Sequence, residues 1–255
     1  MLNYILNHLH FQRKDLIKNI TKIYSPNFNA RPSNININTV IIHYTELGEQ
    51  DTIEHFCNKS SKVSSHFLIN KNGKIYIFVA LEKRAWHAGV SRWKDNHNIN
   101  DNSIGIELEN NGEEVFTKKQ YKALIHLIKY LKRKLPIEDR FILGHSDIAP
   151  QRKIDPGRLF DWKILFKNKI GYLAKINLDD NKIIFNFGAK GDLVKQVQKS
   201  LKMFGYDILV DGIFGPKTSK VIDAFKAHYN PSSLGFDWDS SSNHILKQLL
   251  ACDLK

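Results

Sequence analysis

The feature that most constrains the fold is a short, nearly unbroken β-branched run, TVIIHY, at residues 39–44. Such a run is typical of a central strand covered on both faces, because a strand with one solvated face alternates apolar and polar residues. NSIGIELEN at residues 102–110 does alternate, with Gly105, Glu107 and Glu109 predicted on one face. RFILGH at residues 140–145 is a third candidate strand. These segments predict the centre of a sheet.

A hairpin and a helix complete this part of the chain. SHFLIN and KIYIFV flank KNG, and Asn72-Gly73 is a strong signal for a hairpin turn. From Thr117 the apolar residues recur at helical spacing, Thr117 and Gln120 can form a capping box, and basic residues precede Pro136. Strands mixed with helices predict an α/β domain, a central mixed β-sheet flanked by helices, over residues 24–170.

Three further segments flank or follow this domain. Residues 1–23 are predicted to form an N-terminal helical extension; they make a poor signal peptide, because Asn and His interrupt the apolar residues and the positive charges come after them. Residues 171–186 are predicted to be a linker. Residues 187–255 contain amphipathic stretches at 193–204 and 217–229 and a shorter one, SNHILKQLLAC, which predict a small three-helix domain with a modest core.

Composition narrows the classes of partner. Lys+Arg 38 against Asp+Glu 26 gives a formal net charge of +12, which favours anionic partners such as nucleic acid, anionic lipid or wall polymers. A lysine surplus spread over a solvated surface explains the same charge equally well. No nucleic-acid-binding signature accompanies the charge, so we expect no nucleic-acid partner. No run of about 18 apolar residues predicts a transmembrane segment. Cys57 and Cys252 are too far apart in sequence for a disulfide framework or a zinc knuckle. The sequence leaves the oligomeric state unknown.

Many of the candidate functional residues lie in the loop GHSDIAPQRKIDPG, residues 144–157. Its two glycines and two prolines predict a stiff, irregular loop that is neither helix nor strand. His145 and Asp155 lie in this loop, and His43 ends the first strand. Two histidines and one carboxylate, with a fourth position open to water, is a common composition for catalytic zinc. Spacing alone leaves this open, and a core histidine is the better explanation for His43 taken by itself.

Six ordered motifs then carry a specific resemblance. SPNFNARP, VIIHYTE, VSSHFLI, AWHAGVSRW, NDNSIGIELEN and GHSDIAPQRKIDPG follow the order of the zinc-dependent N-acetylmuramoyl-L-alanine amidases, whose fold is shared with peptidoglycan recognition proteins. The resemblance implies one Zn²⁺ per chain, bound by His43, His145 and Asp155. It also implies that Glu107 is the general base or acid and that Lys153 polarises the scissile carbonyl.

The implied substrate is peptidoglycan or a muropeptide, including 1,6-anhydro forms. The bond cleaved would join N-acetylmuramic acid to L-alanine. Glu107 would deprotonate the attacking water and return the proton to the alanine amine, while zinc and Lys153 stabilise the oxyanion. A position beside Gly105, with room for substrate to approach, favours this role for Glu107 over that of a solvent-facing strand residue.

Other residues in the motifs have less certain roles. Asp147 and Arg152 are expected to brace the loop. A structural role is an open alternative for each residue predicted to line the sugar or peptide groove. These groove candidates are His66, Trp86, His87, Arg92 and Trp93.

The last part of the chain resembles the peptidoglycan-binding three-helix domain. The resemblance rests on a glycine-led helix that contains Val194, Val197, Gln198 and Leu201, and on the turn DGIFGPKT. It implies contact with the cell wall. The substrate favours the cell envelope or periplasm, and the absence of a clear signal peptide keeps the cytoplasm open.

Two other functions are compatible with parts of the sequence. A recognition protein of this fold could bind muropeptide without cleaving it, but all three candidate ligands and both polar helpers are present. A serine hydrolase could use Ser64 or Ser65 with His66. No G-x-S-x-G motif surrounds these serines, and adjacent Ser and His on one strand point to opposite faces.

Overall fold

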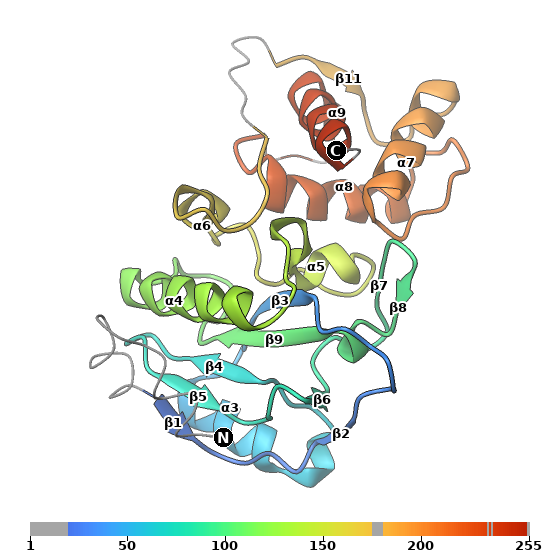
Figure 1. The fold of residues 1–255 in the computed structure, drawn as a ribbon. Helices are drawn as coiled ribbons and strands as arrows, with labels where there is room; N and C mark the ends of the chain where they lie inside the picture. Colours follow the sequence, from blue (N-terminus) through green and yellow to red (C-terminus); the bar gives the residue numbers. More distant parts are fainter. Residues whose placement is uncertain (1–19, 175–180, 234, 236, 254–255) are drawn as a thin grey trace.

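A computed structural model describes residues 20–174, 181–233, 235 and 237–253 (Figure 1). A six-stranded sheet with the order β1-β5-β4-β9-β3-β10 forms its centre. β4, β9, β3 and β10 are parallel, and β5 runs antiparallel to β4, so the predicted mixed sheet is confirmed. The strands are β1 (Ile20–Lys22), β3 (Thr39–Tyr44), β4 (Phe67–Ile69), β5 (Ile75–Ile77), β9 (Ser103–Leu108) and β10 (Ile142–Gly144).

Helices cover both faces of the sheet. α4 (Lys118–Lys134) packs on the face that contains Val40 and Ile42. The predicted capping box starts it: Thr117 Oγ1 accepts the Gln120 N–H at 3.1 Å, and Gln120 Oε1 accepts the Thr117 N–H at 2.9 Å. α3 (Glu49–Cys57) contributes Phe56 to a smaller core on β4 and β5. Every residue of β9 is buried, so it has no solvated face, although its sequence alternates.

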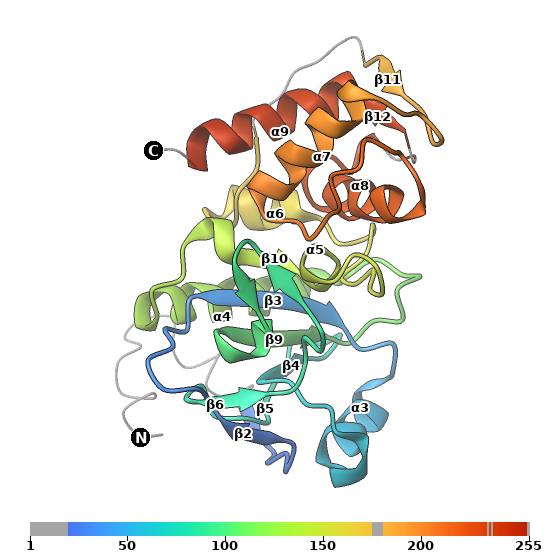
Figure 2. The ribbon, with the colours of Figure 1, turned by 90° about the vertical axis from the view of Figure 1, so that its right-hand side faces the viewer.

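Shorter elements connect these layers (Figure 2). The strand pairs β2–β6 and β7–β8 are both antiparallel. No helix in the described ranges is long and apolar enough to cross a membrane. The elements are β2 (Phe28–Ala30), β6 (Lys83–Ala85), β7 (Arg92–Trp93), β8 (Asn96–His97), the 3-10 helices η1 (Lys59–Ser61), η2 (Ile99–Asp101) and η3 (Asp139–Phe141), and the helices α5 (His145–Ile148) and α6 (Trp162–Lys167).

Two local predictions are corrected. The N-terminal helical extension was expected to reach residue 23, but Ile20–Lys22 is strand β1, because it pairs in parallel with β5 and forms an edge of the sheet. Residues 1–19 lie outside the described residues. The loop at 144–157 was expected to contain no helix, yet its first residues form the single turn α5. The Asp147 side chain stabilises this turn by accepting the Gly144 N–H at 2.7 Å.

The C-terminal domain, predicted at residues 187–255, contains the three expected helices, α7 (Asp192–Phe204), α8 (Pro216–Tyr229) and α9 (Ser240–Asp253). An unpredicted strand pair, β11 (Ile183–Phe185) with β12 (Trp238–Asp239), begins inside the predicted linker. The domain's core is larger than expected because it is continuous with that of the first domain: Ile41 and Leu143 belong to the same buried cluster as Phe225. Figure 1 shows α7 and α8 packed over α5 and β7.

Gln198 organises the turn between α7 and α8. Its buried amide nitrogen donates to Asp211 Oδ1 at 2.8 Å and to Thr218 Oγ1 at 3.0 Å. Its oxygen accepts the Gly212 N–H at 2.7 Å. Phe214 from the same turn is fully buried. The DGIFGPKT motif therefore has a structural role in the turn between α7 and α8.

A buried ion pair within this domain makes stability depend on pH. Lys226 Nζ lies 2.6 Å from Asp239 Oδ2, and both side chains are under 5% exposed. Burial alone would raise the pKa of Asp239, but hydrogen bonds from Lys226, Ser233 and Ser241 outweigh it and lower the pKa to about 2. A carboxyl with a depressed folded-state pKa stabilises the fold above its unfolded pKa of about 4, and this contribution is lost as pH falls towards 2.

Asp239→Asn should therefore lower the free energy of unfolding by about 2 kcal/mol at pH 7, and the deficit should shrink between pH 4 and pH 2. Urea unfolding of both proteins across this range measures it. Asp207→Asn, at an exposed side chain, is the matched control and should change little. A deficit that is the same at every pH would contradict the assignment.

Candidate metal centre and active site

The sheet register brings the candidate residues together. His43 on β3 is the register partner of Glu107 on the neighbouring parallel strand β9. Ile42 is paired with Gly144 at the end of β10, so His145 follows directly beside His43. Parallel strands have their carboxyl ends at the same edge of a sheet, which places these side chains at one site.

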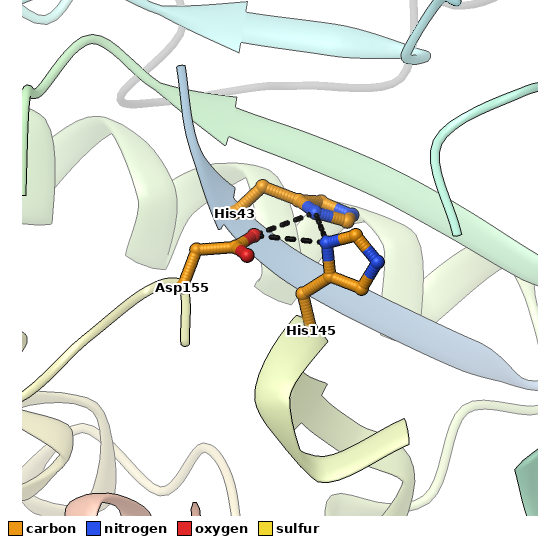
Figure 3. Close-up of side chains that lie close together, drawn as sticks. All are labelled: His43, His145 and Asp155. Carbon is orange, nitrogen blue, oxygen red and sulfur yellow. Dashed lines mark hydrogen bonds and ion pairs between the residues drawn. The ribbon is translucent and has the colours of Figure 1, made fainter. Parts of the chain in front are cut away.

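The three predicted metal ligands converge on one point (Figure 3). His43 Nδ1, His145 Nδ1 and Asp155 Oδ2 are each 3.0 Å from the other two atoms. Zn–N and Zn–O bonds of about 2.0 Å place neighbouring ligand atoms of a tetrahedron about 3.3 Å apart. All three residues are buried. The arrangement therefore fits a small cation with one coordination position left open.

The protonation states also suit a metal. The pKa of His43 is lowered to about 4, mainly by burial; the neighbouring His145 adds to the effect and Asp155 opposes it. Burial opposes ionisation of Asp155, but His145 and His43 outweigh it, so the pKa of this carboxyl lies well below its usual range. A neutral imidazole and an ionised carboxylate are the forms that bind metals.

Hydrogen bonds behind the ligands fix their tautomers. His145 Nε2 lies 3.1 Å from the Ala88 carbonyl oxygen, so it carries the proton and leaves the Nδ1 lone pair free. His43 Nε2 lies 3.0 Å from His87 Nδ1, and His87 Nε2 lies 3.2 Å from Ser103 Oγ. Ser103 donates its own proton to the Ile99 carbonyl. Every group in this series of hydrogen bonds has a partner when each histidine Nε2 donates. This leaves His43 Nδ1 available to bind a metal.

Gly105 provides the space for His87. A Cβ atom on Gly105 would lie 2.5 Å from Cγ of the His87 ring. The sequence interpretation that this glycine opens room for substrate is therefore corrected, because an imidazole occupies the space. Sequence reasoning placed His87 in the groove and missed its hydrogen bond to His43. The available signal was Gly105 itself, two residues before Glu107. A glycine inside a strand often indicates that another group approaches the backbone closely.

Glu107 has the surroundings of a proton carrier. It is 8% exposed, and within the described part of the chain its Oε2 atom has no hydrogen-bond partner. Burial raises its pKa well above the usual range; Asp155 adds to the effect and Lys153 opposes it. Glu107 is not among the three converging ligands. A carboxyl with a free oxygen beside a metal site can accept a proton from water and return it.

A cleft of about 510 Å³ gives access to these groups. Trp86, His87 and Lys153 are among the residues that line it. Arg92 does not contribute to its lining, and one guanidinium nitrogen lies 3.5 Å from Asp207. Lining residues that sequence reasoning did not assign to the groove are Tyr44, Thr45, Glu46, Leu47, Thr52, His55, Phe56, Lys62, Val63, Gly89, Asn100 and Arg152.

The structure corrects the groove prediction for His66 and Trp93. His66 is fully buried; its Nδ1 accepts the Gly105 N–H at 3.0 Å, and burial lowers its pKa to about 3, with Arg31 adding to the shift. It supports the backbone of β9. Trp93 packs edge-on against Tyr206 with ring centroids 5.0 Å apart, at the boundary with the C-terminal domain. No local sequence signal indicates that the second domain covers this tryptophan.

The loop-bracing prediction fits the contacts. Arg152 Nε donates to the Val90 carbonyl at 2.9 Å, and the same guanidinium also contacts the Ala88 carbonyl. A serine hydrolase does not fit. Ser64 Oγ donates to the Asn27 carbonyl, and His66 bonds to backbone groups and Arg31, so no serine–histidine pair forms among these candidates.

Comparisons with known proteins agree with this geometry. The family described as N-acetylmuramoyl-L-alanine amidase matches residues 33–158, and a peptidoglycan binding domain family matches residues 190–233. The chain is 38% identical over 170 residues to the 1,6-anhydro-N-acetylmuramyl-L-alanine amidase AmpD of Haemophilus influenzae, covering 59% of this chain and 92% of that protein. It is 32% identical over 234 residues to the N-acetylmuramoyl-L-alanine amidase AmiD of Escherichia coli, covering 84% and 82%.

A solved structure extends the likeness to the whole fold. The complex of E. coli AmiD with the substrate anhydro-N-acetylmuramic acid-L-Ala-D-gamma-Glu-L-Lys superposes with a TM-score of 0.70 and 29% identity, covering 87% of this chain and 92% of that one. Both the family match and the relatives lead to the same assignment. The chain belongs to the N-acetylmuramoyl-L-alanine amidase family.

Proposed function

We propose that this amidase hydrolyses the bond between N-acetylmuramic acid and L-alanine with one zinc ion bound by His43, His145 and Asp155. The observation that carries the proposal is the triangle of ligand atoms, each 3.0 Å from the others, beside a buried Glu107 whose Oε2 has no hydrogen-bond partner in the part of the chain that the structure describes. The substrate of the AmiD complex is an anhydro-muropeptide. We infer the same substrate class here, including 1,6-anhydro forms.

Zinc bound at this site would polarise the scissile carbonyl and make a water molecule more acidic. Glu107 would take the proton from the attacking water and return it to the alanine nitrogen as the amide bond breaks. Its raised pKa makes it a stronger base than an exposed glutamate. Lys153 lines the same cleft and would stabilise the negative charge on the carbonyl oxygen. His87 would hold His43 in orientation.

Removal of the metal tests the proposal. Dialysis against a chelator should lower the release of L-Ala-led peptide from a defined anhydro-muropeptide by about 10³-fold or more, and one equivalent of Zn²⁺ should restore it. Liquid chromatography of the products and metal analysis of the protein measure both steps. Full activity in a metal-free sample would refute zinc dependence. Binding of the muropeptide without cleavage by the zinc-loaded protein would instead favour the recognition-protein alternative.

The C-terminal domain is proposed to bind the wall polymer. Its support is the match of residues 190–233 to a peptidoglycan binding domain family. Glu107→Gln protein should sediment with insoluble peptidoglycan, since this variant should bind the polymer without digesting it. Protein that stays in the supernatant would contradict wall binding. The substrate class favours action in the cell envelope, and fractionation of cells that produce the protein would test this location against the cytoplasm.

A further inference from the structure

A buried carboxylate next to the metal site is held by the C-terminal domain. Asp147 on α5 is completely buried. Its Oδ2 accepts the Gly144 N–H at 2.7 Å and lies 2.7 Å from His228 Nδ1. Its Oδ1 accepts the Tyr206 hydroxyl at 2.6 Å. Tyr206 and His228 both belong to the C-terminal domain, so two of the three groups that bind this carboxylate come from outside the amidase domain.

His228 is itself held firmly. Its ring stacks on Trp162 with centroids 3.6 Å apart and planes 16° apart, and on Tyr229 at 3.8 Å and 10°. It is 3% exposed. Trp162 belongs to the core of the amidase domain, where it packs on Phe160. The histidine is therefore clamped between elements of both domains, and its Nδ1 is directed at Asp147.

Asp147 connects these contacts to the ligands. By accepting the Gly144 N–H it fixes the first turn of α5, and the first residue of that turn is His145. The same turn fixes the backbone of the carboxylate ligand, because the Ser146 N–H donates to the Asp155 carbonyl at 2.9 Å. There is little free space for the turn to shift, since a Cβ atom on Gly144 would lie 2.7 Å from Pro156 Cδ.

We propose that Tyr206 and His228 are positioning residues for the metal site, and that they hold the α5 turn, and with it His145, through the Asp147 carboxylate. The inference rests on the proposed metal site. Loss of a hydrogen bond to a buried carboxylate leaves a poorly compensated charge, which the turn can relieve only by moving. Changes behind metal ligands typically lower metal affinity 10–100-fold. These residues are one contact further away, so we expect about 3–10-fold.

A pair of substitutions at His228 separates positioning from packing. His228→Phe keeps a ring between Trp162 and Tyr229 but removes the hydrogen bond to Asp147. His228→Asn can keep a side-chain N–H near the position of Nδ1 but removes the stacked ring. Zinc affinity of the full-length apoprotein, measured by competition with a chromophoric chelator, should fall in His228→Phe and be better preserved in His228→Asn. Thermal stability of the apoprotein should show the opposite order: it should be better preserved in His228→Phe, which keeps the ring, than in His228→Asn, which removes it.

Tyr206→Phe provides a milder test, because it removes only the hydroxyl and keeps the contact with Trp93. Its zinc affinity should fall by about 3–10-fold, and the visible spectrum of its Co²⁺ form should shift, since the ligand geometry changes. Phe214→Leu is the matched control. Phe214 is fully buried in the same domain, and its ring contacts Phe185 and Phe187. It should lower the melting temperature and leave zinc affinity and the Co²⁺ spectrum unchanged.

The outcomes distinguish the two proposals. If the wild-type protein binds no Zn²⁺ tightly, the proposed metal site fails. If the wild type binds Zn²⁺ and both Tyr206→Phe and His228→Phe match it in affinity and in Co²⁺ spectrum, the positioning role is overturned, even if these variants melt earlier. Reduced affinity in Phe214→Leu equal to that in Tyr206→Phe would likewise overturn it, because the effect would then follow general stability.

Discussion

Replacement of Glu107 by glutamine is expected to lower kcat for anhydro-muropeptide hydrolysis by about 10³-fold while the bound zinc is retained. Glutamine has nearly the same shape but cannot take a proton from water. Glu107 is not one of the three converging ligand atoms, and its Oε2 has no partner among the described residues, so the substitution breaks no ligand contact. Product release at saturating substrate and the metal content of the purified variant measure the two parts of the prediction.

Glu109→Gln is the control on the same strand. Its carboxylate accepts backbone N–H groups of Glu49 and Lys71, which lie away from the metal ligands. We expect a modest loss of stability and a kcat within about twofold of the wild type. Loss of zinc from Glu107→Gln, or a kcat close to that of the wild type, would remove Glu107 from the role of proton carrier.

Local chemistry explains why much of the fold could be predicted. The β-branched run at 39–44 is β3, the helix after Thr117 begins with the expected capping box, and Asn72-Gly73 lies between β4 and β5. Each of these depends on neighbours within a few residues. The helical turn α5 was missed because its stabilising group, the Asp147 side chain, competes with two glycines and two prolines that favour an irregular loop.

Contacts between segments far apart in the sequence limited how much of the candidate site could be predicted. From spacing alone the candidate ligands His43, His145 and Asp155 could not be separated from isolated core residues, because their convergence depends on the parallel register of β3 with β10. The resemblance to a known family supplied that information. Neither source placed His87 behind His43, nor Trp93 beneath the second domain, since both depend on contacts between segments that local patterns do not link.

Asp155→Asn is expected to have the largest effect on the metal itself. Asp155 is the one anionic group among the three converging ligands, and its carboxylate oxygen lies 3.0 Å from both histidine nitrogens. An amide keeps the size but loses the negative charge and is a weaker zinc ligand. We expect zinc affinity to fall by about 10³-fold or more, and activity at limiting zinc to fall in proportion. Titration of the apoprotein with Zn²⁺ against a chelator measures the change.

The response of each variant to excess zinc should distinguish a loss of metal binding, expected in Asp155→Asn, from a loss of proton transfer, expected in Glu107→Gln. Activity lost in Asp155→Asn should return in part as Zn²⁺ is raised, because mass action refills a weakened site. Activity lost in Glu107→Gln should not respond, because its site is already filled and the missing function is proton transfer. Asp239→Asn removes a different buried carboxylate, one paired with Lys226, and should lower stability with zinc affinity unchanged. Wild-type zinc affinity in Asp155→Asn would show that the carboxylate is not a ligand, and the metal would then have to be held by the histidines and other groups in the cleft.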